Sequence, residues 1–332
     1  MQEVWMAGLR DTWKITGGQP TGRRMVMEWD FLACADLHLQ DTVPVCRKDR
    51  DEFLTKMLHK FWYILRTAKR NNVPVLIAGD IFNYWKPSPW LLGHVIRLLR
   101  ASRTQVLVVP GQHDLPNHNQ ALYKRSGLYV LESAGVVQRV TLTPVQLLAS
   151  GAFLYGAGWE EPIPDPNGNQ PSILLMHRLV WKKKPFPGAD QENRASCVIK
   201  QAKAYSVIVT GDNHAPFVEG NLINCGSMLR STVAQHDHQP RVYLCKIREG
   251  QTPLVKKVFL PLSPPETTID VEQKEQIQSV KEEVELFVRS LSEKNWDVGL
   301  NFRNNLKQFI HENHTEDQVK EWVWKSLEGS CN

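Results

Sequence analysis

The chain has 332 residues, of which 42% are hydrophobic and 23% are charged, as expected for a folded globular protein of one or two domains. No apolar run approaches the roughly 18 residues that cross a membrane, and the polar N-terminus has no secretory segment, so we expect a cytoplasmic protein with no membrane partner. Six cysteines without a C-x-x-C pair argue against a zinc knuckle or a disulfide framework, and the net charge of +5 indicates a polyanionic partner only if it is clustered.

Three parts are predicted along the chain: an irregular N-terminal leader over residues 1–27, a main domain over 28–260, and a linker with a C-terminal helical region over 261–332. The leader is rich in Gly, Pro and basic residues and has no apolar period. In the main domain, short apolar runs end in polar clusters at 30–38, 73–80, 105–114, 172–177 and 206–214. Such runs predict strands that are buried on both faces.

Helices are predicted between the first three strands, over residues 51–69 and 88–101, where apolar residues recur at helical spacing. Ser88 before Pro89 predicts a helix cap. The alternation of strand and helix indicates an α/β fold. Further strands over 151–159, 218–227 and 241–247 are assigned to a second sheet. The predicted fold is thus a two-sheet β-sandwich flanked by helices, followed by a proline-rich linker and a C-terminal helical appendage.

Polar side chains with metal-binding chemistry follow five of the apolar runs. Because the carboxyl ends of strands in α/β sheets are where sites assemble, these side chains are expected to converge. Carboxylate, imidazole and amide groups together suit a pair of divalent cations. Each motif is weak alone, and it is the ordered set that carries the prediction. The candidates are Asp36 and His38, then Asp80, then Gln112, His113 and Asp114, then His177, and finally Asp212 and His214.

The ordered motifs ADLHL, GDIFN, GQHD, MH and GDNH resemble the signature of the calcineurin-like metallophosphoesterases over roughly residues 29–248. The GDIF context and the later NCGS segment are most similar to the SbcD nuclease subunits of bacterial and phage repair complexes. The resemblance implies a calcineurin-like phosphoesterase fold and a two-metal phosphodiester hydrolase. It further implies a DNA exonuclease or endonuclease that acts in repair or recombination.

The resemblance also implies roles for the candidate residues. His113 stands over the scissile phosphate as a general acid or transition-state stabiliser, and Asp114 orients it. Asp80 bridges two divalent metal ions, which we expect to be manganese, with magnesium as the alternative. The implied ligands of the first ion are Asp36, His38, Asp80 and His214, and those of the second are Asp80, Gln112, His177 and Asp212.

Three positions depart from the family pattern. Gln112 stands in place of an asparagine and keeps an amide oxygen that can bind a metal. Asp212 stands in place of a histidine, and its hard anionic oxygen favours manganese or magnesium over softer metals. Asn83 stands where the nuclease relatives usually have aspartate, and it is assigned a supporting role outside the ligand set, in which it hydrogen-bonds a ligand histidine.

Two further segments suggest partners. Lys182, Lys183 and Lys184 lie just after His177, where they either contact a DNA backbone or form a solvated loop. The C-terminal amphipathic helices either pack on the main domain or dock a partner, and the resemblance implies that this partner is an SbcC-type coiled-coil ATPase. A homodimer also stays open as an assembly.

Two competing functions stay open beside the DNA nuclease. The first is a phosphatase or cyclic-nucleotide phosphodiesterase on the same scaffold, which acts on small substrates. The second is a catalytically inactive subunit that binds DNA or serves as a scaffold. Metal content and the preference for duplex DNA over a small phosphodiester distinguish the three.

Overall fold

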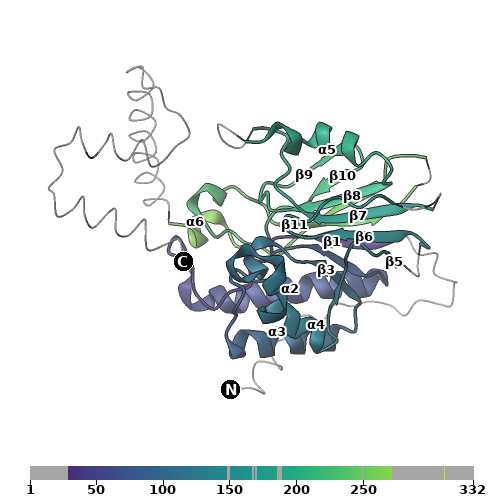
Figure 1. Cartoon of the computed structure of the whole chain (residues 1–332). Coiled ribbons are helices and arrows are strands. Elements are labelled where there is room, and N and C mark those ends of the chain that lie inside the picture. The colour runs from purple at the N-terminus through teal and green to yellow at the C-terminus, as the bar shows by residue number, and fades with distance from the viewer. Residues whose placement is uncertain are drawn as a thin grey trace, which may run out of the picture. The chain divides into compact units, whose positions relative to one another are not determined.

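The computed structural model describes residues 29–270, except 148–149, 167, 169, 185–188 and 249, together with residue 310. The expected leader and nearly all of the expected C-terminal helical region therefore lie outside the described residues. The described chain forms two sheets of six strands each, flanked by helices (Figure 1). This architecture confirms the predicted two-sheet sandwich with flanking helices.

The first sheet has the strand order β12-β11-β1-β2-β3-β4. Its centre is parallel from β1 to β4, whereas β11 pairs antiparallel with β1 and β12 pairs antiparallel with β11. The segment 241–247 was assigned to the second sheet, and that prediction was wrong, because the free edge of β1 takes it up as β11. The strands are β1 (Phe31–Cys34), β2 (Val75–Ala78), β3 (Val106–Val109), β4 (Gln138–Arg139), β11 (Arg241–Lys246) and β12 (Leu254–Phe259).

The second sheet has the strand order β5-β6-β7-β8-β10-β9. Four neighbouring strands, β6, β7, β8 and β10, are parallel, and the short outer strands β5 and β9 pair antiparallel with them. The strands are β5 (Val145–Gln146), β6 (Phe153–Ala157), β7 (Ser172–His177), β8 (Val207–Gly211), β9 (Phe217–Glu219) and β10 (Leu222–Asn224).

The core explains why the central strands are apolar without interruption. Successive side chains of a strand point to opposite faces. Along β1, Phe31 and Ala33 join the apolar layer between the sheets, whereas Leu32 and Cys34 join the layer beneath the helices. Both faces of these strands are therefore buried, which fixes their register and holds their carboxyl ends in place.

The helices cover the two outer faces of the sandwich. Helices α2 (Arg50–Asn71), α3 (Pro89–Ser102) and α4 (Gly127–Ser133) lie against the first sheet, and α5 (Ala195–Gln201) lies against the second (Figure 1). The cap of α3 is confirmed, since the Ser88 hydroxyl accepts the N–H of Leu91 at 3.1 Å. Short 3-10 helices occupy the loops: η1 (Gln112–Asp114), η2 (Pro116–His118), η3 (Gln120–Arg125), η4 (Gln191–Asn193) and η5 (Val233–Gln235).

The proline-rich segment after β12 packs onto the sandwich. It contains the short helix α6 (Pro265–Thr268), and Ile269 is fully buried. Its backbone pairs with the loop before α2, because Lys48 donates to the Thr268 carbonyl at 3.1 Å and Asp270 donates to the Cys46 carbonyl at 2.9 Å. Among the described residues, no helix has the length and apolar character that crossing a membrane requires.

Candidate metal centre

Polar side chains from five strand ends meet at one edge of the sandwich. The Asp36 carboxylate after β1 accepts the backbone N–H of Asp212 after β8, at 3.0 and 3.1 Å for its two oxygens. The His177 ring at the end of β7 lies 2.7 Å from the carbonyl oxygen of Ala78 at the end of β2. These contacts tie the two sheets together at the site. The structure thus brings together most of the predicted side chains: Asp36, His38, Asp80, Gln112, His113, His177, Asp212 and His214.

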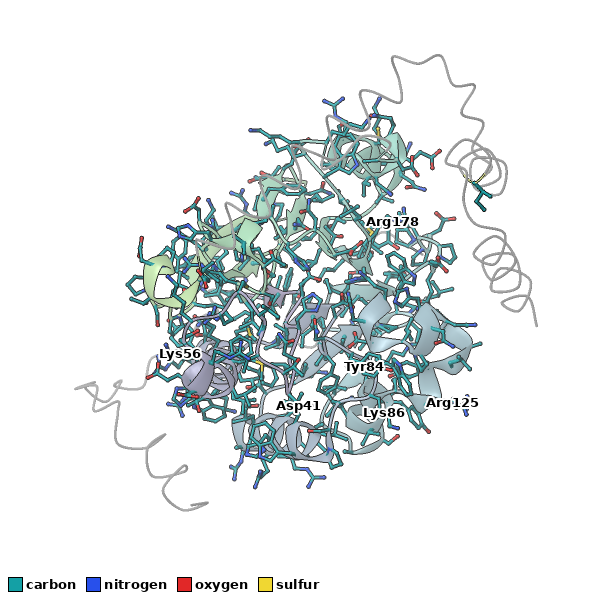
Figure 2. The ribbon with its side chains drawn as sticks, turned by 90° about the vertical axis from the view of Figure 1, so that its left-hand side faces the viewer. Asp41, Lys56, Tyr84, Lys86, Arg125 and Arg178 are labelled. Carbon is teal, nitrogen blue, oxygen red and sulfur yellow. The ribbon has the colours of Figure 1, made fainter. Side chains whose placement is uncertain are left out.

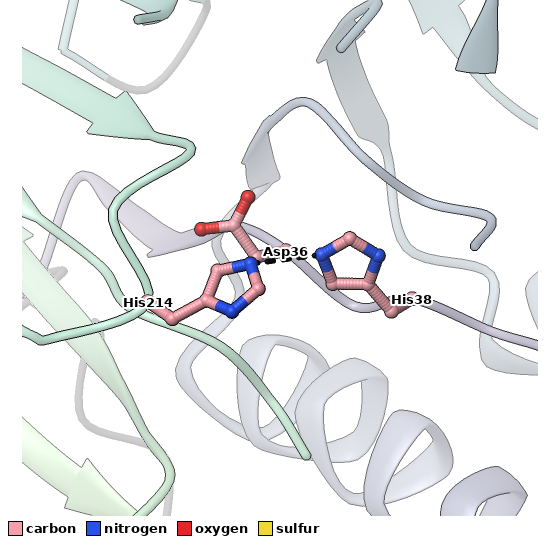
Figure 3. Close-up of side chains that lie close together, drawn as sticks. All are labelled: Asp36, His38 and His214. Carbon is pink, nitrogen blue, oxygen red and sulfur yellow. Dashed lines mark hydrogen bonds between the residues drawn. The ribbon is translucent and has the colours of Figure 1, made fainter. Parts of the chain in front are cut away.

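One part of the site, which we call the His38–His214 half-site, consists of Asp36, His38 and His214 (Figure 3). The Nε2 atoms of the two histidines are 3.0 Å apart, and their rings meet edge to face. One nitrogen or oxygen from each of the three side chains lies within 4.8 Å of the others. This is the spacing of groups that could share one cation.

The other part, which we call the His177 half-site, consists of Gln112, His177 and Asp212. The Gln112 side chain donates from Nε2 to Asp212 Oδ1 at 2.7 Å, so its Oε1 atom faces His177 Nε2. His177 donates from Nδ1 to the Ala78 carbonyl, because a carbonyl oxygen only accepts. If the ring is neutral, Nε2 then carries a lone pair, and this lone pair faces Gln112 Oε1.

Asp80 lies between the two half-sites. Its Oδ1 atom accepts the backbone N–H of His113 at 2.9 Å. Its Oδ2 atom lies 3.8 Å from His38 Nε2 and 3.6 Å from His177 Nε2, and it is buried without a hydrogen-bond partner. A buried polar atom without a partner costs free energy, so this oxygen is positioned for a ligand between the two imidazoles.

The backbone at the site is held in conformations that few residues adopt. Asp36, His38, Asp80 and Asp212 all have positive φ, between 45° and 75°. Non-glycine residues in this region are uncommon, and such strain concentrates at functional sites. Close packing adds to the constraint, because a Cβ on Gly111 would come within 2.1 Å of Asp80 Oδ1.

Burial shifts the pKa values of the cluster toward the uncharged forms of its side chains. Burial is the main cause that raises the pKa of Asp36 to about 8, and it raises the pKa of Asp80 well above its usual range. Burial also lowers the pKa of His38 far below its usual range, and the neighbouring His214 and His113 rings add to the effect. Buried carboxylates facing neutral imidazoles are stabilised by cations, so the donor set fits divalent metal ions.

The surroundings of His113 differ from the prediction. Asp114 was expected to orient this ring, but its carboxylate instead accepts the backbone N–H groups of Gly111, Ile81 and Phe82, at 3.0, 3.3 and 3.1 Å. It therefore fixes the loops around the site, and three backbone donors hold it there. The His113 Nδ1 atom lies 3.1 Å from the Asn83 carbonyl oxygen, which takes the orienting position.

Asn83 also contributes its side chain. This side chain lies beside the His38 ring and favours the protonated form, which opposes the lowering of the His38 pKa by burial. The His38 Nδ1 atom is nevertheless buried without a hydrogen bond of good geometry. Asn83 thus supports two candidate histidines, although the sequence predicted only a side-chain contact.

The three lysines after His177 have separate surroundings. Lys182 forms an ion pair with Glu219 at 3.5 Å, and Lys183 and Lys184 are exposed. A role for these lysines in DNA binding stays a prediction. The prediction also missed Tyr84 and Arg178, which directly follow Asn83 and His177 along the chain, and Gln235, which contacts His214 at 3.1 Å. This adjacency along the chain was the signal that could have identified Tyr84 and Arg178. No sequence signal pointed to Gln235.

Comparison with known proteins identifies the family of the chain. The family model of the calcineurin-like phosphoesterases matches residues 30–216, more than half of the chain, and the chain belongs to this family. No curated protein matches the chain. The crystal structure of TT1561 of Thermus thermophilus aligns with a TM-score of 0.41 and 13% identity, and covers 68% of this chain and 97% of that one. A second crystal structure aligns with a TM-score of 0.39 and 12% identity, and covers 68% and 98%.

Family membership gives the general chemistry of the site. Calcineurin-like phosphoesterases hydrolyse phosphoester bonds with divalent metal ions, so the chain is a metal-dependent hydrolase of phosphoesters. The unpartnered Asp80 oxygen and the neighbouring Gln112 Oε1 and His177 Nε2 atoms lie where cations would satisfy them.

Proposed function

We propose that this phosphoesterase is a DNA nuclease of SbcD type, an exonuclease or endonuclease that acts in repair or recombination. The observation that carries the metal-dependent part is Asp80 Oδ2, which is buried and unpartnered between His38 and His177. When bound there, two divalent cations would activate water and neutralise phosphate charge. We expect these cations to be manganese, with magnesium as the alternative.

The proposed ligands divide as the two half-sites do. Asp36, His38 and His214 would hold one ion, Gln112, His177 and Asp212 would hold the other, and Asp80 would contact both. Asp212 is supported as a ligand by its contact with Gln112 and by its backbone bond to Asp36. Hard oxygen donors in both half-sites support manganese or magnesium.

His113 is the proposed proton donor to the leaving sugar oxygen. Its ring lies 5.0 Å from the His38 ring and is only partly buried, so it can face a substrate phosphate. Because Nδ1 lies against the Asn83 carbonyl, the proton given to the substrate would come from Nε2 of the imidazolium form. Burial lowers the pKa of His113, which makes that form a stronger acid.

The rim of the site supports a nucleic acid as the substrate. Tyr84 directly follows Asn83 and is 58% exposed. The neighbouring backbone is anchored, because the Trp85 carbonyl accepts the Gly127 N–H at 2.7 Å. Lys86, Arg125 and Arg178 lie on the same face as Tyr84, and so does Asp41, whose carboxylate accepts from Ser88 (Figure 2). An exposed aromatic ring among cations suits stacked bases on a phosphate backbone.

A cleavage assay tests the proposal. With Mn²⁺, the chain should degrade linear duplex DNA faster than bis(p-nitrophenyl) phosphate, a small diester. Tyr84→Ala should weaken DNA binding by about 5- to 100-fold, the equivalent of about 1–3 kcal/mol of stacking, and leave small-diester turnover intact. Tyr84→Phe is the matched control, because it keeps the ring.

Other results would favour the competing functions. Hydrolysis of the small diester alone would indicate a phosphatase or cyclic-nucleotide phosphodiesterase. A chain that takes up no metal and cleaves neither substrate would indicate an inactive DNA-binding or scaffold subunit.

We also propose that residues 271–332 dock an SbcC-type coiled-coil ATPase. Support comes from the family resemblance and from the amphipathic spacing of Ile277, Val280, Val284 and Phe287. A pull-down with the ATPase tests this proposal: the full chain should be retained, and a chain that ends at residue 270 should not. Equal retention of both would contradict it.

A further inference from the structure

Gln235 is the residue that contacts His214 from behind. It ends the 3-10 helix η5, and its side-chain Nε2 atom lies 3.1 Å from His214 Nδ1. The His214 Nε2 atom, on the other side of the ring, faces His38. Gln235 therefore touches the candidate metal ligand at the ring nitrogen that points away from the site.

The orientation of the Gln235 amide is fixed by its other bonds. Its Oε1 atom accepts the backbone N–H groups of Ser231 and Thr232, at 2.7 and 3.1 Å. Only an oxygen can accept from these two donors, so the usual ambiguity between amide O and N does not arise. The Nε2 atom then donates one hydrogen to the Ser227 hydroxyl at 3.0 Å, and its second hydrogen points to His214 Nδ1.

This orientation decides which nitrogen of His214 carries the proton. Since Gln235 donates to Nδ1, that nitrogen must be the acceptor, and in a neutral ring the proton is on Nε2. His214 then donates from Nε2 to His38 Nε2 across 3.0 Å. The protons form a directed chain, Gln235 to His214 to His38, which ends on the nitrogen that His38 would offer to a cation.

His177 is prepared in the opposite way. Its Nδ1 atom donates to the Ala78 carbonyl, so in the neutral ring Nε2 carries the lone pair that a cation would bind. Metal-binding histidines almost always donate their second N–H to a carbonyl or a carboxylate, because this fixes the tautomer that binds. At His214 the partner of the second ring nitrogen is instead a donor, the side-chain Nε2 group of Gln235.

We infer that Gln235 is a positioning residue that holds His214 in the tautomer unable to bind metal, so that uptake at the His38–His214 half-site requires a proton shift on His214. For His214 Nε2 to bind a cation, Nε2 must lose its proton and Nδ1 must gain one. The Nδ1–H group would then face the N–H group of Gln235, unless the Gln235 side chain turns away. Turning would break the bonds to Ser231 and Thr232. This inference rests on the proposed metal-binding role of His214.

Gln235→Glu tests the inference by reversing the hydrogen bond to His214, although it also removes the donor to the Ser227 hydroxyl. One carboxylate oxygen can still accept from Ser231 and Thr232, and the other can accept from His214 Nδ1–H. The variant should bind Mn²⁺ at the weaker of two sites about 10- to 100-fold more tightly than the wild type, as measured by calorimetric titration. Gln146→Glu, on the exposed strand β5, is the control for the added charge and should bind as the wild type does.

A second measurement needs no metal. Nitrogen-15 NMR of histidine side chains in the metal-free full chain should show the His214 proton on Nε2 in the wild type and on Nδ1 in Gln235→Glu. Equal or weaker Mn²⁺ binding by a folded Gln235→Glu chain, or a wild-type proton on Nδ1, would overturn the inference. If the wild type binds no Mn²⁺, the proposed function fails, and the NMR result alone still decides the tautomer.

Discussion

The two half-sites contain similar ligands but differ in how the surrounding chain prepares them. The His177 half-site has its imidazole set by a backbone carbonyl, and the Gln112 oxygen already faces the same point. In the His38–His214 half-site, Gln235 donates to His214 and so places the His214 proton on the nitrogen that would bind a cation. The two histidines form a hydrogen bond to each other instead. The comparison teaches that residue type alone does not define a ligand, because the partner behind the ring decides which nitrogen is free.

The largest effect is expected where the half-sites share a residue. Asp80→Asn weakens the charge that both cations need, so hydrolysis of DNA should fall by more than about 10³-fold, the equivalent of several kcal/mol of metal-ion stabilisation. Manganese content, measured by atomic emission, should fall at both half-sites. Loss of only one ion per chain would show that Asp80 serves a single half-site.

A smaller loss is expected at His113, which lies outside both proposed ligand sets. His113→Gln should lower kcat by about 10²- to 10⁴-fold, the range of general acid catalysis, and leave two manganese ions bound. Single-turnover kinetics and metal analysis of the same preparation measure both quantities. If the variant loses metal as well, His113 belongs to the ligand set with His38 and Asp80.

The unequal preparation of the half-sites predicts unequal affinities. Titration of the wild type with Mn²⁺ should resolve two sites that differ by about 10- to 100-fold. His177→Gln should remove the tighter site, and His214→Gln should remove the weaker one, with melting temperatures recorded as a control for folding. Loss of the tighter site in His214→Gln would reverse the comparison.

The smallest effect concerns stability in the absence of metal. The pKa of Asp36 is raised from 3.8 to about 8, so the folded chain keeps a proton that the unfolded chain releases within this interval. The free energy of unfolding should therefore fall as the pH rises through the interval. Below the ordinary histidine pKa of about 6.5, the lowered pKa values of His38 and His214 make the free energy of unfolding rise with pH. The fall due to Asp36 is therefore clearest between pH 6.5 and 8.

Asp36→Asn isolates this contribution. The variant keeps an oxygen for the Asp212 N–H but cannot lose a proton, so its melting temperature should fall less than that of the metal-free wild type between pH 6.5 and 8. Each kcal/mol corresponds to about 2–4 °C in a domain of this size. Thermal melts in a metal chelator measure the difference, and parallel pH profiles would show that Asp36 does not hold this proton.

The sequence alone predicted the sandwich, because strands buried on both faces are continuously apolar and their helices show clear periodicity. It also predicted that ligand-type residues would converge, since they follow strand ends whose direction is fixed by parallel pairing, and Asp36, Asp80 and His177 do meet. Segment 241–247 was misplaced because the edge that a strand joins depends on long-range packing, and local residues do not record it.

The tertiary structure alone decided how the site residues are held. Asp114 follows His113 directly, yet it bonds to the backbone of Ile81 and Phe82 instead of to the neighbouring ring. Gln235 reaches His214 from 21 residues away, through a turn that its own side chain caps. Hydrogen-bond direction depends on where distant donors and acceptors come to lie, and only the folded chain determines that.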